Sequence, residues 1–220
     1  AMETQYKTAA LAGNLYAEPR VDTTGDPVIL GCLTKSQLTK LYTQYLVPEG
    51  KPARQHYEAL KVTTNGKCPL CGGIGHVRTL DHYLPKANFP VYAVLPTNLV
   101  PCCRDCNSDK LNSFAKVQDE QTLHPYFDHD HFFSEKWIHA RVIRNAPPIL
   151  EYYVFPPAHW SHVDKSRAKA HFDEYGLARK FSVEAAADIP ETIEIRRTIM
   201  SQNTPVEFSQ YLAEKGNNGA

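Results

Sequence analysis

The sequence predicts an α+β protein in which a small zinc-held unit of two strands and one helix is flanked by helical additions. Two Cys-x-x-Cys pairs, at 68–71 and 103–106, and apolar residues at helical spacing on either side of them favour this fold class. The chain has 220 residues, 42% of them hydrophobic, which is enough to bury a core. We expect a mainly helical extension at 1–53, the zinc-containing module at 54–116, and a hairpin followed by helices at 117–220.

The segment before the cysteines predicts two helices. Residues 1 to about 33 show only weak periodicity. Ser36 is a candidate N-cap for a helix whose apolar residues recur at helical spacing as far as Leu46, and Pro48 ends it. A second helix is expected from Pro52 to Leu60, leading directly into the first cysteine pair.

The cysteine module predicts two strands and a helix. Lys67–Gly75 is short and glycine-rich, which is typical of a tight hairpin whose backbone amides point at sulfur atoms. Val91–Leu95 indicates a strand or buried segment. Asn107 and Ser108 follow the second cysteine pair and are candidate caps for a helix that starts there.

The last segment predicts a β-hairpin and helices. Strands are expected at 137–142 and 149–155, on either side of a turn at 145–148. The remaining apolar patterns predict helices at 164–177, at 185–201 with an interruption at Pro190, and at 205–215, followed by a frayed polar tail at 216–220.

Four cysteines predict a structural zinc site. Their spacing, C-x-x-C, 31 intervening residues and C-x-x-C, gives the ligand number and local geometry of tetrahedral zinc, and the predicted ligands are Cys68, Cys71, Cys103 and Cys106. Cys102 competes for the fourth position, but only Cys103 keeps the two-residue spacing, so we expect Cys102 to be a buried neighbour. Cys32 is expected to be a core thiol.

Acid, base and amide side chains lie within and beside this zinc loop. Cleavage of a phosphodiester needs a base to activate water and a hard cation to stabilise charge on the phosphate. His82 is the candidate base, and Asp81 offers a carboxylate oxygen of the kind that Mg²⁺ or Mn²⁺ prefers. Asn107 follows Cys106 directly and offers a second oxygen ligand, whereas Asn98 is expected to fix the His82 ring.

Charge distribution bears on the partners of the protein. The formal net charge is zero, but 61–116 contains seven basic and three acidic residues. Contacts with nucleic-acid phosphates would use such an excess, and Lys86, Arg104 and Lys110 are the candidates. The sequence contains neither an apolar stretch of transmembrane length nor a signal-peptide pattern, so we expect a cytoplasmic protein that does not use a membrane.

Three sequence motifs carry a resemblance to a known family. They are Leu80-Asp81-His82-Tyr83-Leu84-Pro85-Lys86, Asn98-Leu99-Val100-Pro101, and Cys103-Arg104-Asp105-Cys106-Asn107-Ser108-Asp109-Lys110. The chain resembles HNH endonucleases of the ββα-metal (His-Me finger) fold, in a zinc-ribbon form similar to endonuclease VII-like nucleases.

The resemblance implies a role for each matching residue. His82 would be the general base, Asp81 and Asn107 would bind the catalytic metal, Asn98 would orient the base, and Lys110 would contact a phosphate. The last residue of the motif is Asn107, whereas the family name implies a histidine at that position. The asparagine favours Mg²⁺ or Mn²⁺ over a catalytic zinc ion.

The flanks of the module extend the resemblance. Arg54–Leu60 and Leu123–Asp128 are similar to flanks of HNH nucleases encoded beside an ATPase in Septu-type and retron-associated anti-phage systems. This implies the effector nuclease of a bacterial defence system, with DNA or RNA as substrate and an ATPase partner. The competing interpretation is a zinc-ribbon module that binds nucleic acid or protein without catalysis.

Overall fold

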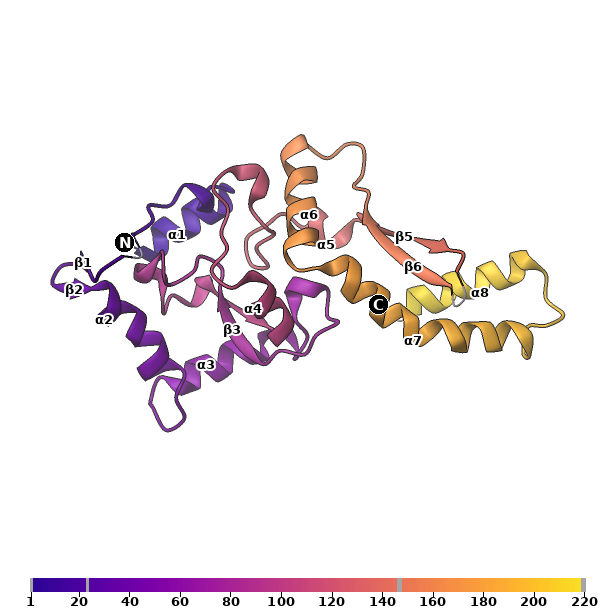
Figure 1. The fold of residues 1–220 in the computed structure, drawn as a ribbon, viewed down its shortest axis with the longest axis horizontal. Coiled ribbons are helices and arrows are strands. Elements are labelled where there is room, and N and C mark those ends of the chain that lie inside the picture. Colours follow the sequence, from indigo (N-terminus) through magenta and orange to yellow (C-terminus); the bar gives the residue numbers. More distant parts are fainter. Residues whose placement is uncertain (1, 23, 146–147, 219–220) are drawn as a thin grey trace.

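The computed structural model describes residues 2–22, 24–145 and 148–218 of the chain. It is an α+β structure, as the sequence predicts, and the described residues form three two-stranded antiparallel sheets between helices. Figure 1 shows a broad body that contains the first two sheets and an arm, drawn in orange and yellow, that contains the third sheet and the last two helices.

The N-terminal segment contains elements that the sequence did not predict. Helix α1 (Met2–Leu11) buries Tyr6 completely, and strands β1 (Val28–Leu30) and β2 (Leu33–Thr34) form a small hairpin. The prediction that Cys32 is a core thiol is wrong, because this residue lies in the turn of that hairpin and is exposed.

Helix α2 (Lys35–Lys40) begins earlier than the predicted cap. Thr34, not Ser36, is the N-cap, and it forms a capping box with Gln37. The helix continues into a π-helical turn, Leu41–Leu46, and ends before Pro48 as predicted.

The π-helical turn Leu41–Leu46 and helix α3 pack on strands β3 (Thr79–His82) and β4 (Leu99–Cys102). Helix α3 (Arg54–Lys61) confirms the second predicted helix. A small apolar cluster joins these helices to the strands behind them and consists of Tyr42, Leu46, Tyr57, Leu80 and Leu99.

The central unit consists of strand β3 (Thr79–His82), strand β4 (Leu99–Cys102) and helix α4 (Arg104–Lys110). The strands are antiparallel, and Asp81 pairs with Val100. Val91–Leu95 is not a strand: it contains a 3-10 turn that is followed by buried Ala93.

Helix α4 starts before the predicted caps. The thiol of Cys103 accepts the Cys106 N–H and thereby serves as the N-cap, so Asn107 lies inside the helix.

The C-terminal elements largely follow the predicted pattern. The hairpin is confirmed, although residues 146–147 of its predicted turn lie outside the described residues. Pro190 does not interrupt its helix, and the last helix continues into the tail that was predicted to fray, of which residues 219–220 are outside the described part. The elements are α5 (His131–Ser134), β5 (Ile138–Ile143), β6 (Ile149–Val154), α6 (His162–Glu174), α7 (Leu177–Arg197) and α8 (Pro205–Asn218).

The main hydrophobic core draws on all three predicted segments of the chain. Tyr6, Leu70, Phe89, Trp137 and Phe172 are among its buried members. The cysteine-containing unit is therefore packed from both sides by residues distant in sequence. Within the described part of the chain, no helix has the length and apolar character needed to cross a membrane.

Candidate functional site

Four cysteine thiols converge at the base of the central unit. Cys68 precedes a short 3-10 turn that ends at Cys71, whereas Cys103 and Cys106 lie at the start of α4. All four are buried, and their Sγ atoms lie within 4.8 Å of one another. Tetrahedral Zn²⁺ with thiolate ligands requires sulfur separations of about 3.8 Å. The cluster could therefore hold a zinc ion, as the spacing predicts.

Backbone amides support these thiols. The Gly75 N–H donates to Cys71 Sγ at 3.3 Å, which confirms the predicted orientation of the glycine-rich hairpin, and the Cys106 N–H donates to Cys103 Sγ at 3.4 Å. Hydrogen bonds with Cys106 and Cys68 lower the pKa of the Cys71 thiol, whereas hydrogen bonds with Cys68 and Cys71 raise the pKa of the Cys106 thiol. Cys102 is buried and lies outside the cluster, as expected.

Lys180 is a neighbour of the cluster that sequence reasoning missed. Its ammonium donates to Cys106 Sγ at 3.2 Å and pairs with Asp109 Oδ2 at 2.7 Å, and its side chain is 7% exposed. A cation beside a thiolate offsets part of the negative charge of a four-cysteine site. Lys180 is a lysine within an ordinary helical pattern more than 70 residues from the cluster, so the sequence contains no signal for this contact.

Three predicted site residues line one pocket beside the cluster. This pocket has a volume of about 280 Å³, and Asp81, His82 and Asn107 are part of its wall. Asp81 and His82 lie at the end of β3, and Asn107 lies on α4 directly after the zinc-cluster residue Cys106. The other residues lining it are Tyr42, Thr79, Leu80, Pro85, Lys86, Leu111 and Asn112.

The His82 ring is fixed by a backbone carbonyl. Its Nε2 lies 2.8 Å from Ala93 O, and the edge of the ring packs against Tyr42 with 4.4 Å between centroids. Because a carbonyl only accepts, Nε2 carries the proton and Nδ1 has the free lone pair. Burial lowers the pKa of His82 to about 3, so the ring is neutral near pH 7.

Asn98 holds the loop before β4 and makes no hydrogen bond to the His82 ring within the described structure. It is fully buried, its Oδ1 accepts the Leu84 N–H at 2.8 Å, and its Nδ2 donates to the carbonyls of Leu84 and Tyr92. The sequence predicts a hydrogen bond between Asn98 and the His82 ring, whereas in the structure Asn98 acts on the ring through the backbone between them. Asn98 fixes the loop that presents Ala93, and Ala93 fixes His82.

The three predicted phosphate contacts have different surroundings. Lys86 is half-buried, lines the pocket and lies over the ring of Tyr42. Arg104 is exposed in the first turn of α4. Lys110 is not available at the surface: it is 3% exposed, its Nζ lies 3.2 Å from Asp81 Oδ2, and it donates to the His82 carbonyl at 2.7 Å.

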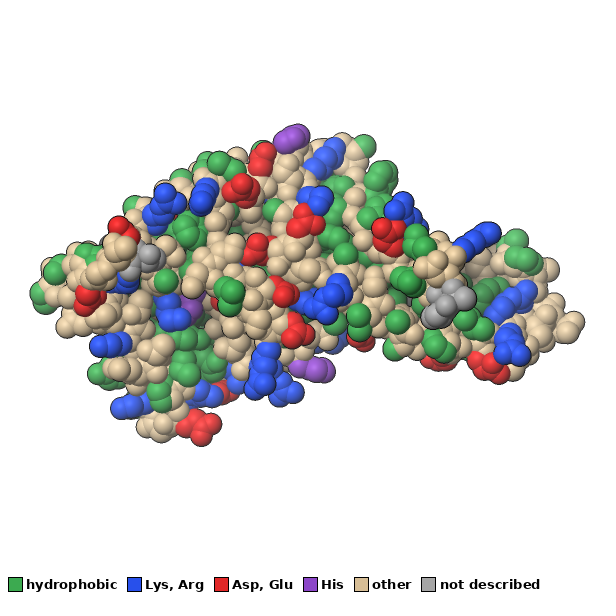
Figure 2. All heavy atoms as spheres, in the orientation of Figure 1, with side chains coloured by type: hydrophobic (Ala, Val, Ile, Leu, Met, Phe, Trp, Pro, Cys, Tyr) green, Lys and Arg blue, Asp and Glu red, His purple; other side chains and the backbone are tan. Residues whose placement is uncertain are grey.

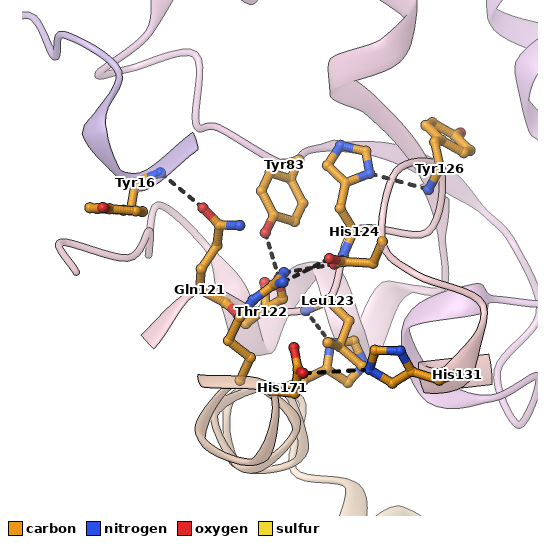
Figure 3. A network of polar contacts seen from close by, with 12 residues as sticks. Tyr16, Tyr83, Gln121, Thr122, Leu123, His124, Tyr126, His131 and His171 are labelled. Carbon is orange, nitrogen blue, oxygen red and sulfur yellow. Dashed lines mark hydrogen bonds and ion pairs between the residues drawn. The ribbon is translucent and has the colours of Figure 1, made fainter. Parts of the chain in front are cut away.

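A polar network connects Tyr83, the residue after His82, to helix α6 (Figure 3). Tyr83, next to His82, donates to the carbonyl of Thr122 at 2.5 Å. Arg167 of α6 binds both oxygens of Asp128 at 2.7 Å, and both side chains are almost fully buried. Residues 122–128 are thus held at one end by Tyr83, which follows strand β3, and at the other end by Arg167 of helix α6.

His171 extends this network to the cysteine cluster. Its Nδ1 accepts the Leu123 N–H at 3.2 Å, which leaves the proton on Nε2 to donate to the Leu70 carbonyl at 3.0 Å. Leu70 lies between the first two cysteines. Helix α6 therefore contacts both the cysteine turn and the loop beside the pocket.

Comparison with known proteins identifies a relative in a bacteriophage. No protein-family model matches the sequence, and no solved structure matches it. The chain is similar to protein ea31 of Escherichia phage lambda, with 38% identity over 221 residues that cover 96% of this chain and 74% of ea31. The name of that relative states no activity. At this identity and coverage, the chain belongs to the protein ea31 family.

Proposed function

We propose that this protein is a metal-dependent HNH endonuclease that hydrolyses phosphodiester bonds in DNA or RNA. The observation that carries the proposal is that Asp81, His82 and Asn107 line one pocket on two antiparallel strands followed by a helix. This is the order of elements expected of the ββα-metal fold, and the cysteine cluster lies beneath it.

His82 has the position and the neutral protonation state that a general base needs. The ring is neutral near pH 7, it lines the pocket, and its Nε2 is bound to Ala93. The other ring nitrogen, Nδ1, can therefore take a proton from a water molecule that attacks the phosphate. Asn98 contributes by holding the loop that contains Ala93.

The remaining pocket residues fit a hard divalent cation. Asp81 supplies a carboxylate and Asn107 an amide oxygen, which are ligand types that Mg²⁺ and Mn²⁺ prefer. When bound, such a cation would stabilise negative charge on the phosphate and on the leaving oxygen. Zinc would be bound by the four cysteines instead, because thiolates are the softer ligands.

The surface around the pocket supports a nucleic-acid substrate. Lys86 contributes a half-buried ammonium to the pocket itself. Figure 2 shows several Lys and Arg side chains at the lower left of the body, over the region of α2 and α3. Because the whole chain has a formal net charge of zero, phosphate contacts would use a local excess of basic residues such as that in 61–116.

Cleavage assays with a base-deficient variant test the proposal. The zinc-loaded protein is incubated with supercoiled plasmid, single-stranded DNA and tRNA, with Mg²⁺ or Mn²⁺ or with neither cation. We expect cation-dependent cleavage that falls at least about 100-fold in His82→Ala, because a general base contributes a factor of this order. His159→Ala removes an exposed histidine far from the pocket and is the matched control.

Two outcomes would contradict the nuclease proposal. A His82→Ala protein that cuts at the wild-type rate would remove His82 from the mechanism. A zinc-containing wild type that binds nucleic acid, cuts none of the substrates, and binds equally well after Asp81→Ala would instead favour the non-catalytic zinc-ribbon module.

We also propose that a bacterial ATPase partner restrains the nuclease until phage infection. The resemblance of 54–60 and 123–128 to nucleases of ATPase-linked systems supports this, as does the absence of a net positive charge that would bind nucleic acid unaided. The test compares cleavage by the purified chain with cleavage after co-expression with a candidate ATPase partner. Equal rates in both preparations would contradict a regulatory partner.

A further inference from the structure

Lys110 is a buried cation at the place where the proposed mechanism requires a metal ligand. It is the last residue of α4, and its ammonium lies between the carboxylate of Asp81, at 3.2 Å, and the carbonyl of His82, at 2.7 Å. The side chain of Lys110 is 3% exposed and that of Asp81 is 9% exposed. The contact is therefore a buried ion pair that ends on the two residues of the predicted catalytic dyad.

This arrangement does not fit the phosphate contact that the sequence predicts for Lys110. An ammonium that reaches a substrate phosphate must be accessible from solvent, whereas this one is enclosed and already has two partners. Arg104, on the opposite end of the same helix, is exposed. Lys110 must therefore act within the protein rather than on its surface.

We propose that Lys110 is a resident cation beside the pocket. Its ammonium competes with the divalent cation for the carboxylate of Asp81 and thereby sets the metal affinity of the site. This inference rests on the proposed function, because it assumes that Asp81 binds the catalytic cation. It adds a positioning residue that acts on the metal through Asp81.

Electrostatics gives the direction of the effect. A divalent cation bound to Asp81 lies within a few ångströms of the ammonium, and like charges at such a distance in a buried site repel strongly. A metal that binds Asp81 must therefore displace the ammonium from it. Lys110 thus weakens metal binding, and in the metal-free protein it keeps the buried carboxylate paired.

A cavity on the far side of Lys110 offers room for displacement. Its volume is about 500 Å³, and Lys110 is part of its wall. Glu120, Asp173 and Glu174 also line it and are acceptors for a displaced ammonium. Because Lys110 lines this cavity and contacts Asp81 in the metal pocket, its side chain lies between the two spaces.

Metal titration of a charge-removing variant tests the inference. Mn²⁺ binding is measured by calorimetry at pH 8 on zinc-saturated protein without nucleic acid, so that no cleavage is required. Lys110→Met keeps the length of the side chain and removes its charge, and we expect it to bind Mn²⁺ on the order of tenfold more tightly than the wild type. Lys116→Met removes the same charge from an exposed position and should bind like the wild type.

The outcomes separate this inference from the proposed function. Mn²⁺ binding by the wild type that is lost in Asp81→Asn and unchanged or weaker in Lys110→Met would overturn the role of Lys110 alone. Absence of Mn²⁺ binding in both the wild type and Lys110→Met would overturn both the resident cation and the metal-dependent mechanism.

A measurement on the wild type covers the case in which Lys110→Met does not fold. The protein is treated with an amine-acetylating reagent with and without Mn²⁺, and modification of Lys110 is quantified by mass spectrometry. We expect Mn²⁺ to increase acetylation severalfold, because metal and ammonium exclude each other from Asp81 reciprocally. Asp81→Asn should abolish the increase, and equal acetylation with and without Mn²⁺ in the wild type would contradict displacement of Lys110.

Discussion

Leu111 has a backbone conformation that its side chain disfavours. It follows the last residue of α4 with a φ of 49° and a ψ of −115°, and it lines the pocket that contains Asp81 and His82. Residues other than glycine rarely occupy this region, because Cβ collides with the neighbouring backbone. Since 69% of Leu111 is exposed, packing of its side chain does little to offset the strain.

We predict that Leu111→Gly is more stable than Leu111→Ala. Both variants remove the exposed side chain, but only glycine relieves the positive φ, so the free energy of unfolding should differ by about 1 kcal/mol in favour of glycine. Urea denaturation of the two zinc-loaded variants measures this difference. Equal stabilities would mean that the alanine backbone relaxes to an unstrained turn.

Residues of the candidate site differ in how far the sequence reveals them. The four cysteines and the Asp81-His82 pair follow from local spacing, because their chemistry is encoded in short motifs. Lys180 and the burial of Lys110 could not be predicted, because both depend on where α4 and α7 pack. The sequence indicates Asn98 as a site residue, but its side chain binds the backbone of Leu84 rather than the His82 imidazole.

At the scale of elements, helix α7 contacts the cysteine cluster through one side chain near its start. Lys180 connects this helix to Cys106 and to Asp109 of α4. The helix then continues into the arm that also contains β6 and α8 (Figure 1). The packing of the arm and the retention of zinc are therefore expected to depend on each other.

We predict that Lys180→Met releases zinc faster than the wild type. Loss of a charged neighbour of a metal ligand typically weakens metal binding by a factor of 10 to 100, so release should accelerate on the order of tenfold. Transfer of zinc to a coloured chelator, followed by stopped flow, measures the rate. Arg179→Met removes an exposed charge from the adjacent position and is the control; equal rates for the two variants would contradict a role for Lys180.

Elements with strong local signals were predicted best. The β5–β6 hairpin and helices α3, α6 and α8 follow alternating or helical patterns between clear turn residues. The β1–β2 hairpin was not predicted, because strands of three and two residues leave almost no pattern. Val91–Leu95 resembles a strand in composition, but Pro90 and the hydrogen bonds of Asn98 favour a compact turn in this segment.

At the scale of the whole molecule, buried neutral histidines occur in a strand, in a loop and in a helix. Burial lowers the pKa of His82 and of His124 to about 3 and that of His171 to about 4. In the unfolded chain these rings take up protons below about pH 6.5. The folded chain does not do so until the pH approaches 4, so the stability that they contribute is complete above pH 6.5 and is lost as the pH falls through this window.

We predict that His124→Gln reduces the acid sensitivity of the protein. Between pH 7.5 and pH 5, each buried histidine costs about 2 kcal/mol of stability, because only the unfolded state is protonated. The variant should therefore lose about 2 kcal/mol less than the wild type over this interval in urea unfolding. His56→Gln changes an exposed histidine and should retain the full loss; an unchanged loss in His124→Gln would contradict the prediction.

The backbone of Gly75 lies so close to Cys103 that it limits which residues this family can accept at position 75. A Cβ at this position would lie 2.5 Å from the sulfur of Cys103. Even alanine would therefore push one of the four sulfurs out of place, although Gly75 has no reactive group. In a survey of natural or random variants, Gly75 should be as intolerant as the cysteines, and its invariance would reflect the space around a sulfur atom rather than a part in any reaction.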